Sequence, residues 1–106
     1  MICRMWRGWT RKEDASAYED YLNNELFPRV RSELSRFGYR GYHVLRAERG
    51  DETEFVTMLW FDSLGGVKAF AGENYETPMI SERARTLLSR YSDRCDHYEM
   101  AGAEWR

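Results

Sequence analysis

Apolar residues along the first third of the chain change their spacing once, close to residue 10. Residues 2–9 hold aliphatic and aromatic side chains without a helical period, and this predicts a strand. Further along, apolar side chains recur every three or four positions, at Tyr18, Leu22, Leu26, Val30, Leu34 and Phe37. Positions with this spacing lie on one face of a helix, so the pattern predicts a long amphipathic helix.

Four residues mark the expected ends of this helix and a bend within it. Thr10, with Glu13 three positions later, matches a capping box, so we expect the helix to begin there. Pro28 is expected to kink the helix, because proline lacks a backbone N–H and its ring clashes with the preceding turn. Gly38 follows the last apolar position and is expected to end the helix.

Residues 39–63 predict a β-hairpin that leads into a short helix. Two stretches of strand-forming residues flank a turn signal at Gly50-Asp51. Asp62 or Ser63 can cap the helix that follows. A pair of glycines in its first turn lowers the intrinsic stability of that helix.

The last third of the chain predicts a loop, a helix and a strand, at residues 72–78, 80–91 and 93–100. The complete order is β-α-β-β-α-β, with the second α interrupted by the loop. This order predicts an α+β, ferredoxin-like fold, in which one antiparallel sheet of strand order 4-1-3-2 carries its helices on one face. The length of 106 residues fits a single domain over residues 1–106.

Both sides of the predicted sheet are apolar. The second strand of the hairpin places Phe55 and Leu59 on one side and Met58 and Trp60 on the other. A sheet with helices on one face normally has a polar second face, so this pattern requires a second cover. We expect a homodimer packed through the sheet face. The alternative is that a loop and the C-terminal tail cover this face within one chain.

Charge and cysteine content argue against several function classes. The formal net charge is −2 and acidic residues are interspersed with basic ones, so we expect no nucleic-acid partner. No apolar run approaches the ~18 residues of a transmembrane helix, and the N-terminus does not match a signal peptide, so we expect no membrane segment. Two cysteines, Cys3 and Cys95, are too few and too far apart for a disulfide framework, and they favour a reducing, cytoplasmic setting.

Candidate catalytic chemistry centres on His97 and Arg4. A histidine such as His97, in the last predicted strand, can take or give a proton near neutral pH. Arg4 shares a face of the first strand with Trp6 and could hold an anion. Two plainer interpretations stay open, namely a His97 that is bonded to the backbone or lies at the dimer interface, and a salt bridge between Arg4 and Glu99. The sequence has no metal-ligand spacing and no glycine-rich phosphate loop, so we expect no metal.

Aromatic residues make up 15% of the chain and could form the walls of a pocket for a flat ligand. The candidate substrate-binding residues are Trp6, Trp60, Tyr18, Phe70 and Tyr75. Tyr75 lies in the loop over residues 72–78, which is a candidate lid with Gly72 at its start. The alternative is that these aromatics only pack the core or an interface.

The segments "MICRMWRGWT", "EFVTMLWFDSLGGVKAFAGENYE" and "RARTLLSRYSDRCDHYEM" resemble the antibiotic-biosynthesis-monooxygenase superfamily. The resemblance covers nearly the whole chain. It implies a dimeric α/β barrel made of two ferredoxin-like subunits. It also implies oxidation of quinol-type or polyketide-like aromatics without a metal or flavin cofactor, or else haem degradation.

Departures from the residues of the haem-degrading branch disfavour haem degradation. That branch is expected to carry an asparagine on the first strand, where this chain has Arg4 and Trp6. Phe70 stands in place of its tryptophan, and Met79 or Ile80 in place of its histidine. We therefore expect a cofactor-independent, monooxygenase-like protein that acts on a small aromatic or quinol-type molecule. The alternative is a non-catalytic module, either a small-ligand binder or a structural dimer.

Overall fold

In the computed structural model, which describes residues 1–105, the first strand lies inside the sheet. β1 (Ile2–Arg11) pairs along its whole length with β3 (Glu52–Phe61), and β3 pairs in turn with the edge strand β2 (Tyr39–Arg49). On its other side, β1 pairs near its end with β4 (Leu88–Tyr91) and near its beginning with β5 (Asp96–Glu99). Two short strands therefore share the position beyond β1.

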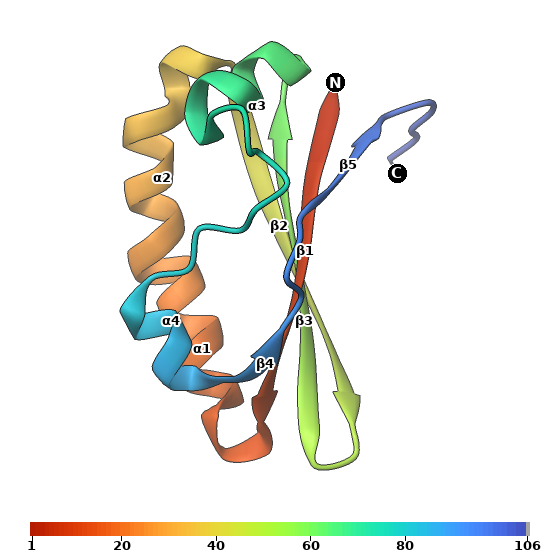
Figure 1. The fold of residues 1–106 in the computed structure, drawn as a ribbon. Helices are drawn as coiled ribbons and strands as arrows, with labels where there is room; N and C mark the ends of the chain where they lie inside the picture. Colours follow the sequence, from red (N-terminus) through yellow and green to blue (C-terminus); the bar gives the residue numbers. More distant parts are fainter. Residues whose placement is uncertain (106) are drawn as a thin grey trace.

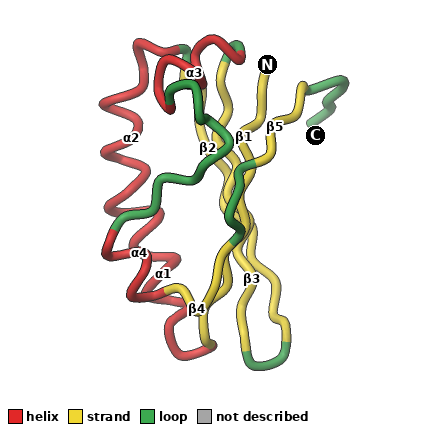
Figure 2. The backbone as a smooth tube through the Cα atoms, viewed as in Figure 1, coloured by secondary structure: helices red, strands yellow, loops and turns green. Residues whose placement is uncertain are grey.

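All of these pairings are antiparallel, and the helices lie on one face of the sheet (Figures 1 and 2). The observed order β2-β3-β1-β4, with β5 also paired to β1, confirms the predicted order 4-1-3-2 with one refinement, the division of the last strand. The fold is α+β, and its arrangement is consistent with a ferredoxin-like domain. No helix in residues 1–105 is long and apolar enough to cross a membrane.

The predicted long helix forms in two α-helical parts. α1 (Ala15–Tyr21) passes through a π-helical turn (Leu22–Leu26) into α2 (Phe27–Leu34). Pro28 lies in the first turn of α2, directly after this wider turn, which is where the predicted disturbance of the helix appears. Gly38 ends the helical stretch with a left-handed φ of 79°, as predicted.

The predicted capping box at Thr10 is wrong. β1 continues to Arg11, and a 3-10 turn (Lys12–Asp14) leads into α1 without a side-chain cap. Thr10 is fully buried in the sheet, where it pairs with Thr53. Its Oγ1 has no hydrogen-bond partner within residues 1–105. Strand pairing has therefore overridden a local helix-start signal.

The predicted helix over residues 80–91 is also too long. α4 (Glu82–Leu87) is capped by Ser81, whose Oγ accepts a hydrogen bond of 3.1 Å from the N–H of Ala84. Leu88 then turns extended and opens β4, next to Gly8 of β1. A side-chain carbon at Gly8 would lie 2.9 Å from Leu88 Cδ2, so the glycine makes room for this leucine.

The helix after the hairpin, α3 (Leu64–Ala71), begins as predicted. Of the two candidate caps, Ser63 is the one used, because its Oγ accepts a hydrogen bond of 3.3 Å from the N–H of Gly66. A side-chain carbon at Gly66 would lie 2.1 Å from the carbonyl oxygen of Phe37. The glycine therefore allows α3 to approach the end of the long helix closely, which outweighs its low helix propensity.

The two faces of the sheet differ in their cover. On the helix side, Phe55 and Phe61 of β3 are buried with Tyr18, Leu22 and Val67. The opposite face, here called the outer face, carries Met5, Trp9, Leu45, Val56, Met58, Trp60 and Tyr98. Leu45 and Tyr98 are 50% and 54% exposed. Residues 100–105 are exposed, and the chain turns back on itself after β5 (Figure 1). The C-terminal residues therefore leave Leu45 and Tyr98 exposed on the outer face.

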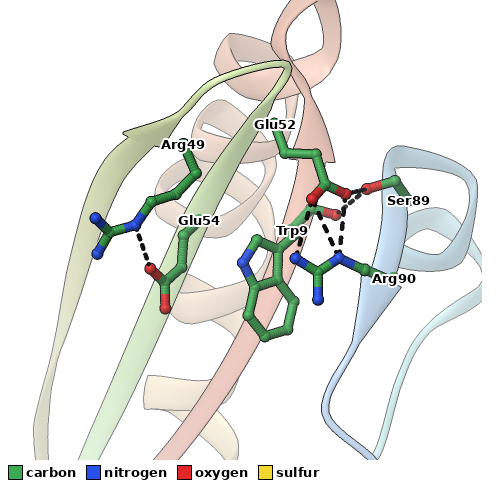
Figure 3. A network of polar contacts seen from close by, with 6 residues as sticks. All are labelled: Trp9, Arg49, Glu52, Glu54, Ser89 and Arg90. Carbon is green, nitrogen blue, oxygen red and sulfur yellow. Dashed lines mark hydrogen bonds and ion pairs between the residues drawn. The ribbon is translucent and has the colours of Figure 1, made fainter.

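A network of charged side chains borders the outer face near the hairpin turn (Figure 3). The guanidinium carbon of Arg90 lies 4.0 Å from the centre of the Trp9 ring, and its Nη2 lies 3.0 Å from Glu52 Oε1. Arg49 Nε donates to Glu54 Oε1 at 2.9 Å. The apolar patch thus has a polar rim at this end, an arrangement typical of protein interfaces.

Candidate functional site

A cavity of about 410 Å³ lies between the helix side of the sheet and helices α1 and α2. Cavities of this size are typical of small-molecule sites. Most of the side chains around it are apolar, so it suits a largely apolar ligand with few polar groups. The residues most relevant to recognition are Arg4, Trp6 and Thr57 on the sheet, Tyr18 and Tyr21 on α1, and Phe70 and Cys95 at the other end.

Arg4 is the buried charge in the wall of this cavity, with only 5% of its surface exposed. Its Nη1 donates to the carbonyl oxygen of Tyr75, and its Nη2 lies 3.5 Å from that of Thr77. Within residues 1–105 no carboxylate pairs with Arg4, so the expected salt bridge with Glu99 does not form. A buried cation without a carboxylate partner is energetically unfavourable unless an anion joins it.

The charge of Arg4 persists despite its burial. Burial lowers the pKa of the Arg4 guanidinium, and the nearby Cys95 thiol opposes that shift. Arginine begins from so high a pKa that it stays protonated at physiological pH. For Cys95, burial raises the thiol pKa more than Arg4 lowers it, so this thiol stays protonated and does not neutralise the guanidinium.

His97 lies on the other side of Arg4, with its Nε2 3.1 Å from Arg4 Nη1. Arginine can only donate, so we assign Nε2 as the acceptor and place the ring proton on Nδ1. Burial, and then the charge of Arg4, lower the pKa of His97, while Glu76 and Asp96 act in the opposite direction. The imidazole is therefore neutral at neutral pH and can accept a proton.

A second cavity, of about 260 Å³, lies on the His97 side of Arg4. It is lined mainly by polar residues, and Cys95 borders both cavities. His97 contacts Tyr75 edge to face, with 5.0 Å between ring centres. The residues around this second cavity are Tyr75, Glu76, Arg94, Cys95, Asp96, His97 and Tyr98.

The loop between α3 and α4 is fastened at its middle to the start of β5. The N–H of Cys95 donates to the carbonyl oxygen of Glu76 at 2.7 Å, and Arg94 forms an ion pair with the Glu76 carboxylate. Arg4 adds its contact to the carbonyl of Tyr75. The predicted hinge Gly72 has a left-handed φ of 83°, a conformation that favours glycine. The Arg4 guanidinium thus contacts the lid candidate and the cavity at once.

Four of the predicted site residues, Arg4, Trp6, Tyr18 and Phe70, line the larger cavity. Trp6 Nε1 donates to the carbonyl oxygen of Ser92 at 2.8 Å, which fixes the indole in place. The Phe70 ring lies 5.8 Å from the Arg4 guanidinium carbon. These residues come from β1, α1 and α3, so the fold brings together positions that are far apart in the sequence.

The other predicted site residues lie elsewhere. His97 and Tyr75 border the smaller cavity and not the larger one. Trp60 lies on the outer face, where its Nε1 donates to Nδ1 of the exposed edge-strand residue His43 at 2.9 Å. Trp60 therefore forms no wall of either cavity, because it and Trp6 project from opposite faces of the sheet.

Cys95 and Ser81 are among the residues of the larger cavity that sequence reasoning missed. Cys95 precedes His97 by two positions, and this spacing in an extended segment could have indicated a shared side. Ser81 reaches the cavity through the path of the loop, and its Oγ lies 2.6 Å from the hydroxyl of Tyr21. No pattern in the sequence predicts such a loop path.

The site contains chemical groups that are suited to anion recognition and proton transfer. Within residues 1–105, no three His, Cys, Asp or Glu side chains gather as metal ligands. What the arrangement offers is a buried guanidinium, a neutral imidazole in contact with it and an apolar cavity. Compared with known proteins, the chain matches no protein-family model, and a search of the curated proteins likewise finds no match.

Proposed function

We propose that the protein binds a small aromatic or quinol-type molecule in the larger cavity, with an acidic oxygen of the ligand held by Arg4. The observation that carries this proposal is that Arg4 is buried in the wall of an apolar cavity and has no carboxylate partner within residues 1–105. A phenolate or carboxylate oxygen would supply the missing negative charge and accept a charge-assisted hydrogen bond. Trp6 and Phe70 would contact the aromatic ring.

We further propose that the chain belongs to the antibiotic-biosynthesis-monooxygenase superfamily and oxygenates this ligand without a cofactor. A base removes the phenol proton, and the phenolate places electron density on the ring carbon opposite its oxygen. That carbon forms a bond to O₂, and the proton returns to give a hydroperoxide. Cleavage of the O–O bond with loss of water leaves a quinone, so one phenol and one O₂ give one quinone and one water. Arg4 favours the first step by stabilising the phenolate.

His97 is the proposed acid–base group for this reaction. Its imidazole is neutral, and its Nε2 contacts the guanidinium that would hold the phenolate. To accept the phenol proton, Nε2 has to exchange its contact with Arg4 for one with the ligand oxygen.

One observation favours the second candidate, a non-catalytic ligand-binding module. His97 does not line the larger cavity, and its Nε2 is already engaged by Arg4. In this alternative, Arg4 and the aromatic walls capture the ligand and no turnover follows.

The apolar outer face supports a homodimer in which a second copy of the chain packs on this face, as in a dimeric α/β barrel. Within residues 1–105, Leu45 on this face is exposed, and Met5, Trp9, Val56, Met58 and Trp60 are only partly buried. The charged rim around Trp9 limits the patch at one end (Figure 3). A cytoplasmic location stays a prediction from the cysteine content, and Cys3 and Cys95 are both free, buried thiols.

Oxygen uptake measured beside ligand binding separates the two candidate functions. The panel consists of phenols and hydroquinones, and the proteins are wild type, His97→Ala and the matched control His43→Gln. Oxygenation predicts uptake by wild type and by His43→Gln, and a loss of roughly a hundredfold or more in His97→Ala. Equal rates in wild type and His97→Ala would remove His97 from the mechanism. Binding without any uptake would leave the binding module.

A further inference from the structure

The hydroxyl of Tyr18, in the wall of the larger cavity, has no hydrogen-bond partner within residues 1–105. Tyr18 is 2% exposed and lines the cavity from α1. Its ring packs edge-on against Phe55, with 5.0 Å between ring centres, and stacks on Tyr21 at 6.3 Å. These contacts hold the ring on both sides. Within residues 1–105, no group forms a hydrogen bond with its hydroxyl.

The Tyr18 hydroxyl is not fully enclosed by the protein. Among the side-chain polar atoms of the described residues, Thr10 Oγ1 is the only one both fully enclosed and without a partner. The Tyr18 hydroxyl also has no partner, so it is not fully enclosed and retains some accessible surface. The space that Tyr18 lines is the larger cavity. Burial raises the pKa of Tyr18 strongly, so this group is a neutral hydroxyl that can both donate and accept.

The neighbouring Tyr21 differs from Tyr18 in this respect. Its hydroxyl is 2.6 Å from Ser81 Oγ, and that oxygen also accepts the N–H of Ala84 at the start of α4. Tyr21 is thus tied into the protein, whereas Tyr18 leaves a hydrogen bond to be made by something in the cavity. An unpaired polar group in a buried site is unfavourable, so a ligand that supplies the partner gains affinity.

Arg4 and Tyr18 relate to different levels of the sheet that forms the floor of the cavity. Arg4 pairs with Leu59 across the sheet, whereas Gly8 pairs with Phe55, the residue on which Tyr18 packs. Four residues of strand separate these two levels, about 13 Å at a rise of about 3.3 Å per residue. The floor between them carries Trp6 and its partner Thr57, which also line the cavity.

We propose that the ligand is an elongated aromatic of two or more rings with an oxygen at each end, one anionic and bound to Arg4, the other neutral and bound to the Tyr18 hydroxyl. The neutral end is a hydroxyl or a carbonyl. The two strand levels are about 13 Å apart along β1, so we take the ligand to be longer than a single ring, and Tyr18 then selects fused or linked rings with a distal oxygen. This inference rests on the proposed function, because it takes Arg4 as the anion-binding end.

Three naphthoates measured by calorimetry test this assignment with the full chain. One carries no hydroxyl, one carries its hydroxyl at the end of the ring system farthest from the carboxylate, and one carries it beside the carboxylate. The variants are Tyr18→Phe, Arg4→Met and the matched control Tyr42→Phe. Tyr42 donates its hydroxyl to Asn23 Oδ1 at 2.9 Å and does not line the cavity.

Wild type and Tyr42→Phe should bind the distal hydroxynaphthoate about fivefold or more tightly than either other compound. Tyr18→Phe should lose this preference and keep its affinity for the plain naphthoate. If wild type shows no distal preference while plain naphthoate binding still depends on Arg4, the Tyr18 assignment fails and the proposed function stands. The assignment also fails if Tyr18→Phe keeps the preference or loses plain naphthoate binding as well. If no naphthoate binds, or if Arg4→Met leaves naphthoate affinity unchanged, the Tyr18 assignment and the proposed function both fail.

Discussion

Arg4 Nη1 and His97 Nε2 lie 3.1 Å apart, on directly paired residues of β1 and β5. One partner is a guanidinium that is always charged, and the other is an imidazole that must be neutral to accept its hydrogen bond. A proton on His97 would replace this hydrogen bond by the repulsion of two cations. The state of His97 is therefore coupled to the position of the group that we propose binds the ligand.

Folding stability should respond to pH through His97. Burial and Arg4 lower the pKa of folded His97 below the ordinary value of 6.5, so the unfolded chain takes up the proton more readily. The stability gained from neutral His97 is fully present above pH 6.5 and decreases as the pH falls below it. His97→Gln keeps a neutral acceptor without this titration. Urea unfolding between about pH 7.5 and about pH 5.5 should show a steeper loss in wild type, and equal slopes would contradict the assignment.

Thr10 and Thr53 face each other across β1 and β3, both fully buried, yet their hydroxyls differ. Thr53 Oγ1 donates to Glu48 Oε2 at 3.1 Å, whereas Thr10 Oγ1 has no partner within residues 1–105. Thr10→Val removes an unpaired hydroxyl and keeps the branched shape, so it should raise the free energy of unfolding by about 1 kcal/mol. Thr53→Val should lower it by a similar amount. Chemical denaturation measures the free energy of unfolding of both variants, and a lower value for Thr10→Val than for wild type would contradict this prediction.

The outer face should determine the oligomeric state. Met58 lies in the middle of that face, paired with Met5 on one side and His43 on the other. Met58→Glu would bury an unpaired carboxylate in the dimer, so the variant should sediment as a folded monomer while wild type sediments as a dimer. Ser32→Glu, on the exposed side of α2, should remain dimeric. A monomeric wild type at micromolar concentration would contradict the homodimer.

Local signals were sufficient for the hairpin and for most helix ends. Gly38 and Gly50 both adopt left-handed backbone, as turn and cap glycines do, and Ser63 caps the helix that follows the hairpin. The signals failed where tertiary pairing competed with them. Thr10 resembled a helix cap, and Leu88 fitted a helical period, but both pair in the sheet instead. Neighbouring strands, which local sequence does not reveal, decided these two positions.

The sequence predicted the part of the site that depends on alternation along a single strand. Alternation along β1 separates Trp6, in the cavity, from Trp9, beside Arg90 on the outer face. Alternation within β3 could not place Trp60, because its face depends on the register between the strands. Trp6 pairs with Thr57, so even positions of β1 share a face with odd positions of β3. That register follows from packing and is not visible in either strand alone.

The most direct test of the central claim, that Arg4 holds an anion in the cavity, compares the affinities of plain naphthoate and its neutral primary amide. The two compounds have nearly the same shape and differ in charge. Wild type should bind the acid about tenfold or more tightly than the amide, and Arg4→Met should lose this preference. Arg29→Met, at an exposed position of the same cavity, should keep it. Equal binding of acid and amide by wild type, or an acid preference that survives in Arg4→Met, would contradict the claim.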